Sequence, residues 1–166
     1  MSASLLMLPL LVDHLPPGGA VARPSRIDQF EISVIESGAP MLDLPTTHRF
    51  TPGLYIREVT LSVGVIYTTR THKTEHPFVL SQGVVSVFHD DGSVRRLKAP
   101  HTGITPPGAR RAILVHEAAV WTTFHPTTET DLEKLEQLLV EPRPAHAATR
   151  HCLQPNATQP TIPALS

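Results

Sequence analysis

The stretch GVIYTTRTHKTEHPFVLSQG, residues 64–83, carries the strongest fold signal in the chain. Its first half is rich in β-branched and aromatic residues, which favour strands. Pro77 disfavours helical backbone in His76, the residue before it. We therefore predict a strand, a turn at residues 73–75 and a second strand. On such a backbone Arg70 and His72 share one face, and His76 points back toward the same space.

The letters His72-x-x-Glu75-His76 also match H-x-x-E-H, the zinc-binding pattern of the inverted zinc peptidases, whose glutamate is the general base. That chemistry requires both histidines on one helix, because only the helical period brings residues i and i+4 to the same face. The preceding β-rich run and Pro77 argue against a helix here. We therefore disfavour the peptidase interpretation and place Glu75 in a turn.

The centre of the chain is a succession of short β patterns separated by Gly, Pro and Asp. The predicted strands are residues 54–61, 64–72, 78–80, 83–88, 93–97, 112–115 and 119–124. Many short strands at near-regular spacing indicate an antiparallel sandwich or barrel. A capping box at residues 130–133 predicts one helix after the strands. Its apolar stripe, which should pack on the barrel, consists of Leu132, Leu135, Leu138 and Leu139.

The flanks differ in composition from this centre. Residues 1–45 are predicted to form an N-terminal arm with one or two strands, built from the apolar patches 5–12 and 30–35. Residues 46–140 are predicted to form the barrel and its helix. Residues 141–166 are rich in proline and poor in large apolar side chains, so we predict a disordered tail.

The overall composition excludes several classes of function. The 166 residues carry 14 Lys and Arg against 15 Asp and Glu, which leaves no basic stripe for nucleic acid. No apolar run is long enough to span a bilayer. The single cysteine, Cys152, cannot form an internal disulfide, so a cytoplasmic protein is expected. No nucleotide-binding glycine loop or serine nucleophile motif is present.

Residues 64–83 resemble the first motif of the cupin superfamily, G-x5-H-x-H-x3–4-E-x6-G, with both glycines and the three polar positions in register. Pro106-Pro-Gly108-x2-Arg111 resembles the core of the second motif, P-x-G-x2-H. The resemblance extends over about residues 50–126. Parts of the sequence are also similar to small single-domain cupins encoded by bacteriophages and prophages, which would place the protein in the host cytoplasm.

The cupin resemblance implies an all-β, jelly-roll barrel that often forms a dimer, with a metal held inside by histidines and a carboxylate. The chain departs from that ligand set. Arg70 and Arg111 stand at two histidine positions and His76 at the glutamate position, so only His72 matches. Arginine stays protonated and has no lone pair for a metal, so the usual site is absent.

Two interpretations of the barrel interior remain open. In one, a divalent metal such as Fe, Mn, Zn or Ni is bound by His72 and His76, with help from Glu75, His116 or His125. In the other, the barrel holds no metal, and a cationic pocket takes a small carboxylate or phosphate ligand. The ligand-binding residues of this second interpretation are Tyr67, Arg70 and Arg111.

The fold does not determine the function, because the same barrel serves enzymes, binding modules and storage proteins. The leading hypothesis is a small-molecule-binding cupin with a degenerate metal site, with or without metal-dependent catalysis. The alternative is a non-catalytic structural or accessory protein, such as a component of a phage particle. The lost ligands, the apolar arm and the proline-rich tail favour this alternative.

Overall fold

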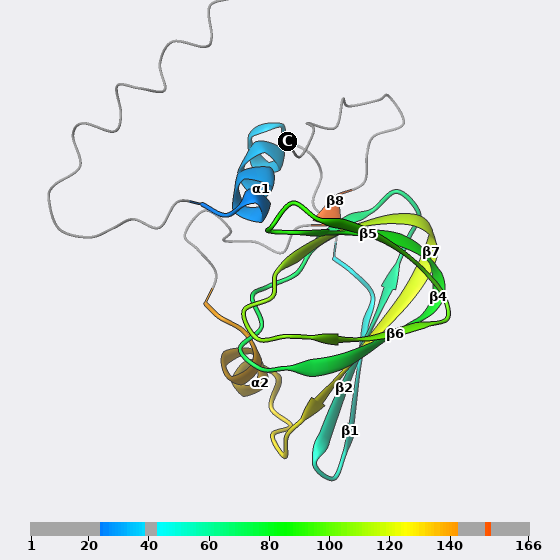
Figure 1. The fold of residues 1–166 in the computed structure, drawn as a ribbon. Helices are drawn as coiled ribbons and strands as arrows, with labels where there is room; N and C mark the ends of the chain where they lie inside the picture. The colour runs from blue at the N-terminus through cyan, green and yellow to red at the C-terminus, as the bar shows by residue number, and fades with distance from the viewer. Residues whose placement is uncertain (1–23, 39–42, 143–151, 154–166) are drawn as a thin grey trace, which may run out of the picture.

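The computed structural model describes residues 24–38, 43–142 and 152–153, so the apolar patch at residues 5–12 lies outside the described residues. In this part of the chain, eight strands form one antiparallel sheet that curls into a barrel (Figure 1). The predicted all-β barrel with a helix after its strands is confirmed. The strands are β1 Thr46–Thr51, β2 Leu54–Leu61, β3 Ile66–Thr68, β4 His76–His89, β5 Val94–Lys98, β6 His101–Thr105, β7 Arg111–Pro126 and β8 Cys152–Leu153.

Two long strands organise the barrel. β4 pairs with β7 along most of its length, and each of the two then carries two shorter strands on its other edge. β7 pairs with β2 and β3, and β4 pairs with β5 and β6. Where the sequence predicts two strands, at 78–80 and 83–88, the structure has one, because the pairing with β7 continues past Gly83 through register shifts.

The barrel interior is a continuous apolar core. Most of its residues come from alternate positions of β2, β4 and β7, as the period of two requires. Phe78 and Trp121 stack within it, with ring centroids 4.3 Å apart. The core consists of Val59, Leu61, Val65, Phe78, Leu80, Val85, Val87, Leu97, Ile113, Val115, Ala119 and Trp121.

The predicted strand at residues 30–35 is wrong, because this segment belongs to helix α1, Arg26–Glu36. Ser25 and Asp28 form a capping box at its start, with each side chain bonded to the backbone N–H of the other residue. The alternation of apolar and polar residues within this short segment is typical of a strand. The buried residues, however, recur every three or four positions, which is the spacing of one face of a helix. The buried apolar residues of this helix are Ile27, Phe30 and Val34.

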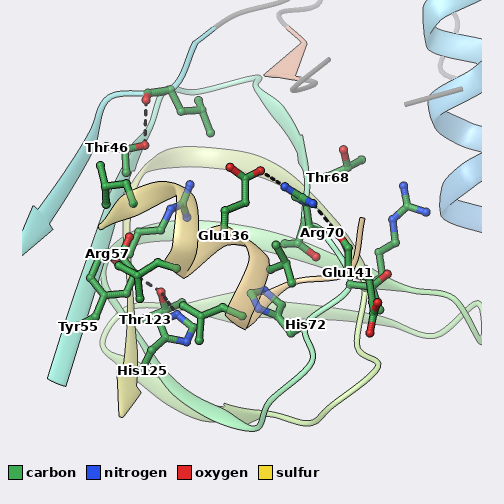
Figure 2. A pocket seen from close by; sticks show the side chains of 18 of the residues that line it. Thr46, Tyr55, Arg57, Thr68, Arg70, His72, Thr123, His125, Glu136 and Glu141 are labelled. Atoms are coloured by element: carbon green, nitrogen blue, oxygen red, sulfur yellow. Dashed lines mark hydrogen bonds and ion pairs between the residues drawn. The ribbon is translucent and has the colours of Figure 1, made fainter. Parts of the chain in front are cut away.

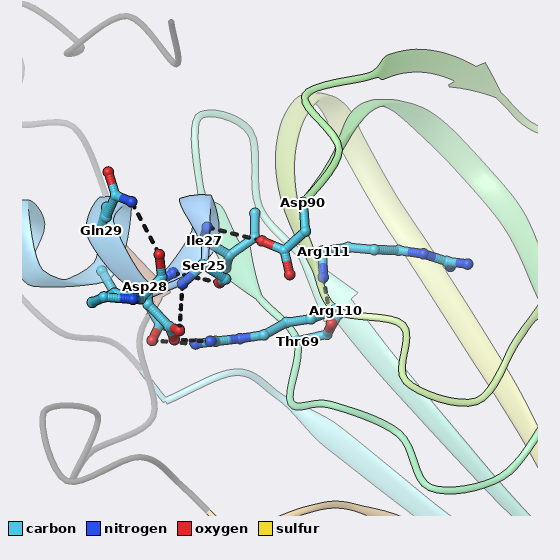
Figure 3. A network of polar contacts seen from close by, with 10 residues as sticks. Ser25, Ile27, Asp28, Gln29, Thr69, Asp90, Arg110 and Arg111 are labelled. Carbon is cyan, nitrogen blue, oxygen red and sulfur yellow. Dashed lines mark hydrogen bonds and ion pairs between the residues drawn. The ribbon is translucent and has the colours of Figure 1, made fainter. Parts of the chain in front are cut away.

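Arg110 attaches α1 to the barrel. Its guanidinium donates to the carboxylates of Asp28 and Glu31 on the helix (Figure 3). The backbone N–H of Ile27 also donates to the Asp90 side chain, over 3.1 Å. Burial alone would lower the pKa of Arg110, but the two carboxylates raise it above its ordinary value. Arg111, the next residue, points the opposite way, toward the barrel (Figure 3).

Helix α2, Leu132–Leu139, lies on one end of the barrel (Figure 1). It begins one residue later than the predicted box, with Asp131 as N-cap for the backbone N–H groups of Glu133 and Lys134. Leu135 and Leu139 pack against Tyr55, whereas Leu132 and Leu138 of the predicted stripe are exposed. Within the described residues, neither helix has the length and apolar character needed to cross a membrane.

The predicted tail contributes to the sheet. Cys152–Leu153 pairs with β3 as the two-residue strand β8, so this part of residues 141–166 has a defined place in the fold. β1 and β6 were not predicted from the sequence. The burial pattern of β1 shows the reason, because nearly all of its residues are exposed and it therefore lacks the alternation of a half-buried strand.

Candidate functional site

A cavity of about 380 Å³ lies between α2 and the inner face of strands β1, β2 and β7 (Figure 2). Strand pairing brings its polar residues side by side. Arg57 on β2 is paired with His48 on one side and with Thr123 on the other. Tyr55 is paired with His125 in the same way. Because residues two apart share a face, these side chains form one inward-facing polar surface at the end of the apolar core.

α2 and the segment before β4 form the opposite wall. Arg70 forms an ion pair with Glu136 of α2 and donates to the carbonyl oxygen of Glu141, so it joins the two segments of this wall (Figure 2). Lys73 adds a bond to the carbonyl oxygen of Gln137, 2.8 Å away. Four leucines contribute to the apolar lining, namely Leu44, Leu132, Leu135 and Leu139.

Three imidazoles meet beside the floor of this cavity. The ring centroids of His72 and His76 are 4.3 Å apart, those of His76 and His125 are 4.4 Å apart, and those of His72 and His125 are 6.1 Å apart. His72 and His125 line the cavity. Nδ1 of His72 and Nδ1 of His125 are both buried without a hydrogen-bond partner. Such atoms are costly in an interior unless a ligand or water bonds to them.

The imidazoles are held in their neutral form. Burial is the largest cause that lowers the pKa of His72, and together with the neighbouring histidines, Arg111 and Arg57 it brings this pKa to about 3. Burial, His76 and Arg57 also lower the pKa of His125 to about 3. Burial lowers the pKa of His76 as well, although its bond to the carbonyl oxygen of Thr74 opposes the effect. Neutral imidazole both donates and accepts hydrogen bonds, so the floor is polar without being charged.

Acidification from about pH 7 to about pH 5 is expected to lower the free energy of unfolding by about 2 kcal/mol through His125 alone. The pKa of this group falls from 6.5 to about 3 on folding, so between these values the unfolded chain binds more protons than the folded chain. Stability therefore rises with pH across this window and is lost on acidification. Urea unfolding at the two pH values measures the effect. The substitution His125→Gln should flatten the pH dependence, and an unchanged slope would contradict the prediction.

The three imidazoles do not fit a divalent metal. In the described part of the chain, no three His, Cys, Asp or Glu side chains are arranged to hold an ion. Nε2 of His125 is 3.1 Å from Oγ1 of Thr123, and Nδ1 of His76 bonds to the carbonyl oxygen of Thr74, so two of the nitrogens have other partners. Arg57 and Arg111 also place positive charge beside the cluster, which repels a cation.

The structure separates the residues predicted to share one site. Tyr67, Arg70 and His72 line the large cavity, whereas Arg111 lines a second, smaller one. His76 joins His72 and His125 as described above. The other two metal candidates lie apart from this cluster: Glu75 is exposed in the turn before β4, and the ring of His116 bonds to Ser86 over 2.7 Å.

Arg57, His48 and Tyr55 also line the cavity, but they were not predicted from the sequence. The alternation of buried and exposed residues along β2 does indicate the direction of the Arg57 side chain. Arg57 has the parity of Val59 and Leu61, which are buried in the core, so it had to face the same interior. The contribution of His48 could not be predicted from the sequence, because β1 has no alternation of apolar and polar residues to show which of its faces points inward.

No family model matches the sequence, and no curated protein matches it. Solved structures with a similar fold include salicylate 1,2-dioxygenase from Pseudaminobacter salicylatoxidans, at 12% identity and a TM-score of 0.48. The match covers 67% of this chain and 34% of the dioxygenase, so the chain spans about a third of that protein.

Two further neighbours are described as cupins. The Cnp3 cupin domain of Schizosaccharomyces pombe is 19% identical, with a TM-score of 0.44 and coverage of 61% of this chain and 70% of that one. A cupin-2 domain protein from Shewanella frigidimarina is 13% identical, with a TM-score of 0.42 and coverage of 57% and 90%. At these identities the likeness concerns the fold alone. The resemblance to phage and prophage cupins finds no support in the comparisons.

Proposed function

We propose that this cupin-like barrel binds a small organic anion in the cavity beneath α2. The proposal rests on the charge of Arg57 and on the carboxylate partners available to it. Its guanidinium lines the cavity and forms no ion pair with any carboxylate in the described part of the chain. Arg70 and Arg110 also line the cavity, but each is already paired with acidic side chains. Arg57 is therefore the cation best placed to receive a ligand's carboxylate.

The rest of the cavity suits the body of such a ligand. Its volume of about 380 Å³ lies within the range of small-molecule sites, roughly 300–1,000 Å³. The leucines of α2 and the ring of Tyr55 supply apolar contact on one side. The unbonded Nδ1 atoms of His72 and His125 supply hydrogen bonds at the floor. Tyr67, predicted from the sequence as a ligand residue, forms part of the wall.

The substitution Arg57→Gln is expected to weaken binding of a carboxylate about tenfold to a hundredfold, because one charge-assisted hydrogen bond contributes about 1.5–3 kcal/mol. The measurement is the shift in melting temperature across a concentration series of benzoate and of short aliphatic carboxylates. Arg49→Gln is the matched control. Arg49 lies on the neighbouring strand β1 and pairs with Glu58 on the surface, so this variant should bind like the wild type.

Three results would overturn the proposal. If no carboxylate stabilises the protein, or if Arg57→Gln binds as tightly as wild type, the cavity is not an anion site, and the structural or accessory role becomes the better hypothesis. If protein purified without a histidine tag contains about one equivalent of metal per chain, and the metal is lost in His72→Ala, the metal interpretation replaces the anion site.

A further inference from the structure

A second cavity, of about 150 Å³, lies at a different place in the barrel and shares no lining residue with the large one. It opens to solvent and is lined by residues of β4, β5 and β6 and by the first residue of β7. Its volume corresponds to roughly five water molecules at about 30 Å³ each, which is too small for an organic ligand of ordinary size. A compact ion or a terminal group of a larger molecule fits this space better.

The charged and ionisable residues around this cavity are all of basic type. The described residues that line it include two arginines and two histidines, and none of them carries a carboxylate. These four residues are His89, Arg95, His101 and Arg111. Arg111 and His89 are direct cross-strand partners. Burial lowers the pKa of His89 and of Arg111, and Arg95 lowers both further, although Asp91 opposes the effect on His89.

Arg111 is the central residue of this cavity. Its side chain is buried, with the residue only 8% exposed, and its Nε has no hydrogen-bond partner. Nη1 donates to the hydroxyl of Thr105 over 3.1 Å, and the guanidinium carbon lies 5.4 Å from the centroid of the Phe78 ring. Neither neighbour is negatively charged, and Arg111 forms no ion pair within the described residues. A buried guanidinium without a counter-ion is unusual, since buried charges are generally paired.

The surroundings keep this guanidinium in place. Gly103 on β6 faces Phe78, and a Cβ at this position would come within 2.6 Å of the Phe78 ring. The absence of a side chain at Gly103 therefore leaves room for the ring over which Arg111 lies. The site is thus built from packed strands, with its cation oriented before any ligand arrives.

We propose that this second cavity binds a small tetrahedral oxyanion, namely phosphate, sulfate or a phosphomonoester group, with Arg111 as its buried partner and Arg95 as its second cation. His89 and His101 donate hydrogen bonds from the edge of the site. Guanidinium groups match such anions in charge and in the direction of their N–H groups. This site is separate from the carboxylate site at Arg57, because the two cavities share no lining residue.

The test is calorimetric titration of the full chain with inorganic phosphate at constant ionic strength. We expect saturable binding to the wild type. Arg95→Gln should weaken it about tenfold, because one charge-assisted contact is lost. Arg96→Gln is the matched control, since Arg96 is also exposed on β5 but has the opposite parity and does not line the cavity. Arg57→Gln should leave phosphate binding unchanged, which separates this site from the first.

Arg111→Gln should abolish phosphate binding. If that variant does not fold, the comparison of Arg95→Gln with Arg96→Gln decides the matter. A parallel titration with glycerol 3-phosphate tests whether the bound anion is a free ion or a phosphate group of a larger molecule. Tighter binding than that of inorganic phosphate assigns the site to a phosphate group of a larger molecule. Equal or weaker binding assigns the site to the free ion. The proposal is overturned if phosphate does not bind at millimolar concentration, or if Arg95→Gln and Arg96→Gln bind it equally.

Discussion

Replacement of Gly83 by alanine is expected to lower the free energy of unfolding by about 3–5 kcal/mol. Gly83 lies in β4 with φ +89, a conformation that side chains with a Cβ rarely adopt. A Cβ there would lie 2.4 Å from the carbonyl oxygen of Ala118 and 2.6 Å from that of Glu117. Both atoms belong to the backbone of β7, so relief would require the two central strands of the barrel to separate.

Gly53→Ala provides the control for this prediction. Gly53 has a similar φ of +77, but no atom lies within 4 Å of the position its Cβ would take. The free energy of unfolding of this variant should therefore fall by only about 1–2 kcal/mol, which is the cost of a residue with a Cβ in this backbone conformation. Urea unfolding of the two variants measures the difference. Equal losses would show that the close approach to β7 does not contribute.

The substitution Arg110→Met is expected to destabilise the protein by about 3–5 kcal/mol, because it leaves a buried carboxylate without its partner. The side chain of Glu31 is only 5% exposed, and Arg110 itself is 9% exposed. Loss of the guanidinium also removes the bond to Asp28 at the capping box of α1. The free energy of unfolding, measured with urea, should fall accordingly.

Two further variants test this interpretation. Arg49→Met breaks the exposed pair with Glu58 and should cost about 1 kcal/mol or less. Adding Glu31→Leu to Arg110→Met should restore much of the lost stability, because the uncompensated charge is then gone. If the double variant is as unstable as the sum of the two single variants, the pair is not coupled and the prediction is contradicted.

Several features of the fold could be predicted from the sequence, because they depend on residues that are close together along the chain. The predicted strand at residues 54–61 coincides with β2, whose alternation matches its buried and exposed faces. The glycines that bound the cupin-like motif, Gly64 and Gly83, both adopt positive φ, as turns and bulges require. The strand prediction at residues 30–35 failed because a short apolar run is compatible with either period, and the capping residues outside the run decided for a helix.

Only part of the candidate site could be predicted from the sequence. His72 and His76 were predicted to converge, and their rings do lie together. Arg70 and Arg111 were predicted to share a pocket, but they line different cavities. The sequence could not separate them, because their positions depend on which neighbour each side chain meets. Arg70 meets Glu136 of α2, 66 residues away in the chain. Arg111 meets Thr105 and the ring of Phe78.

The sequence by itself determined the strand-rich character of the chain, the turn at residues 73–75 and the departure from a cupin metal site, because these follow from local propensity, proline geometry and the identity of the side chains. Only the tertiary structure decided which charges are neutralised. Arg110 is paired with Glu31, 79 residues away, whereas Arg57 and Arg111 have no such partner among the residues that the structure describes. Charge compensation depends on strands and helices that are distant in sequence and meet only when the barrel closes.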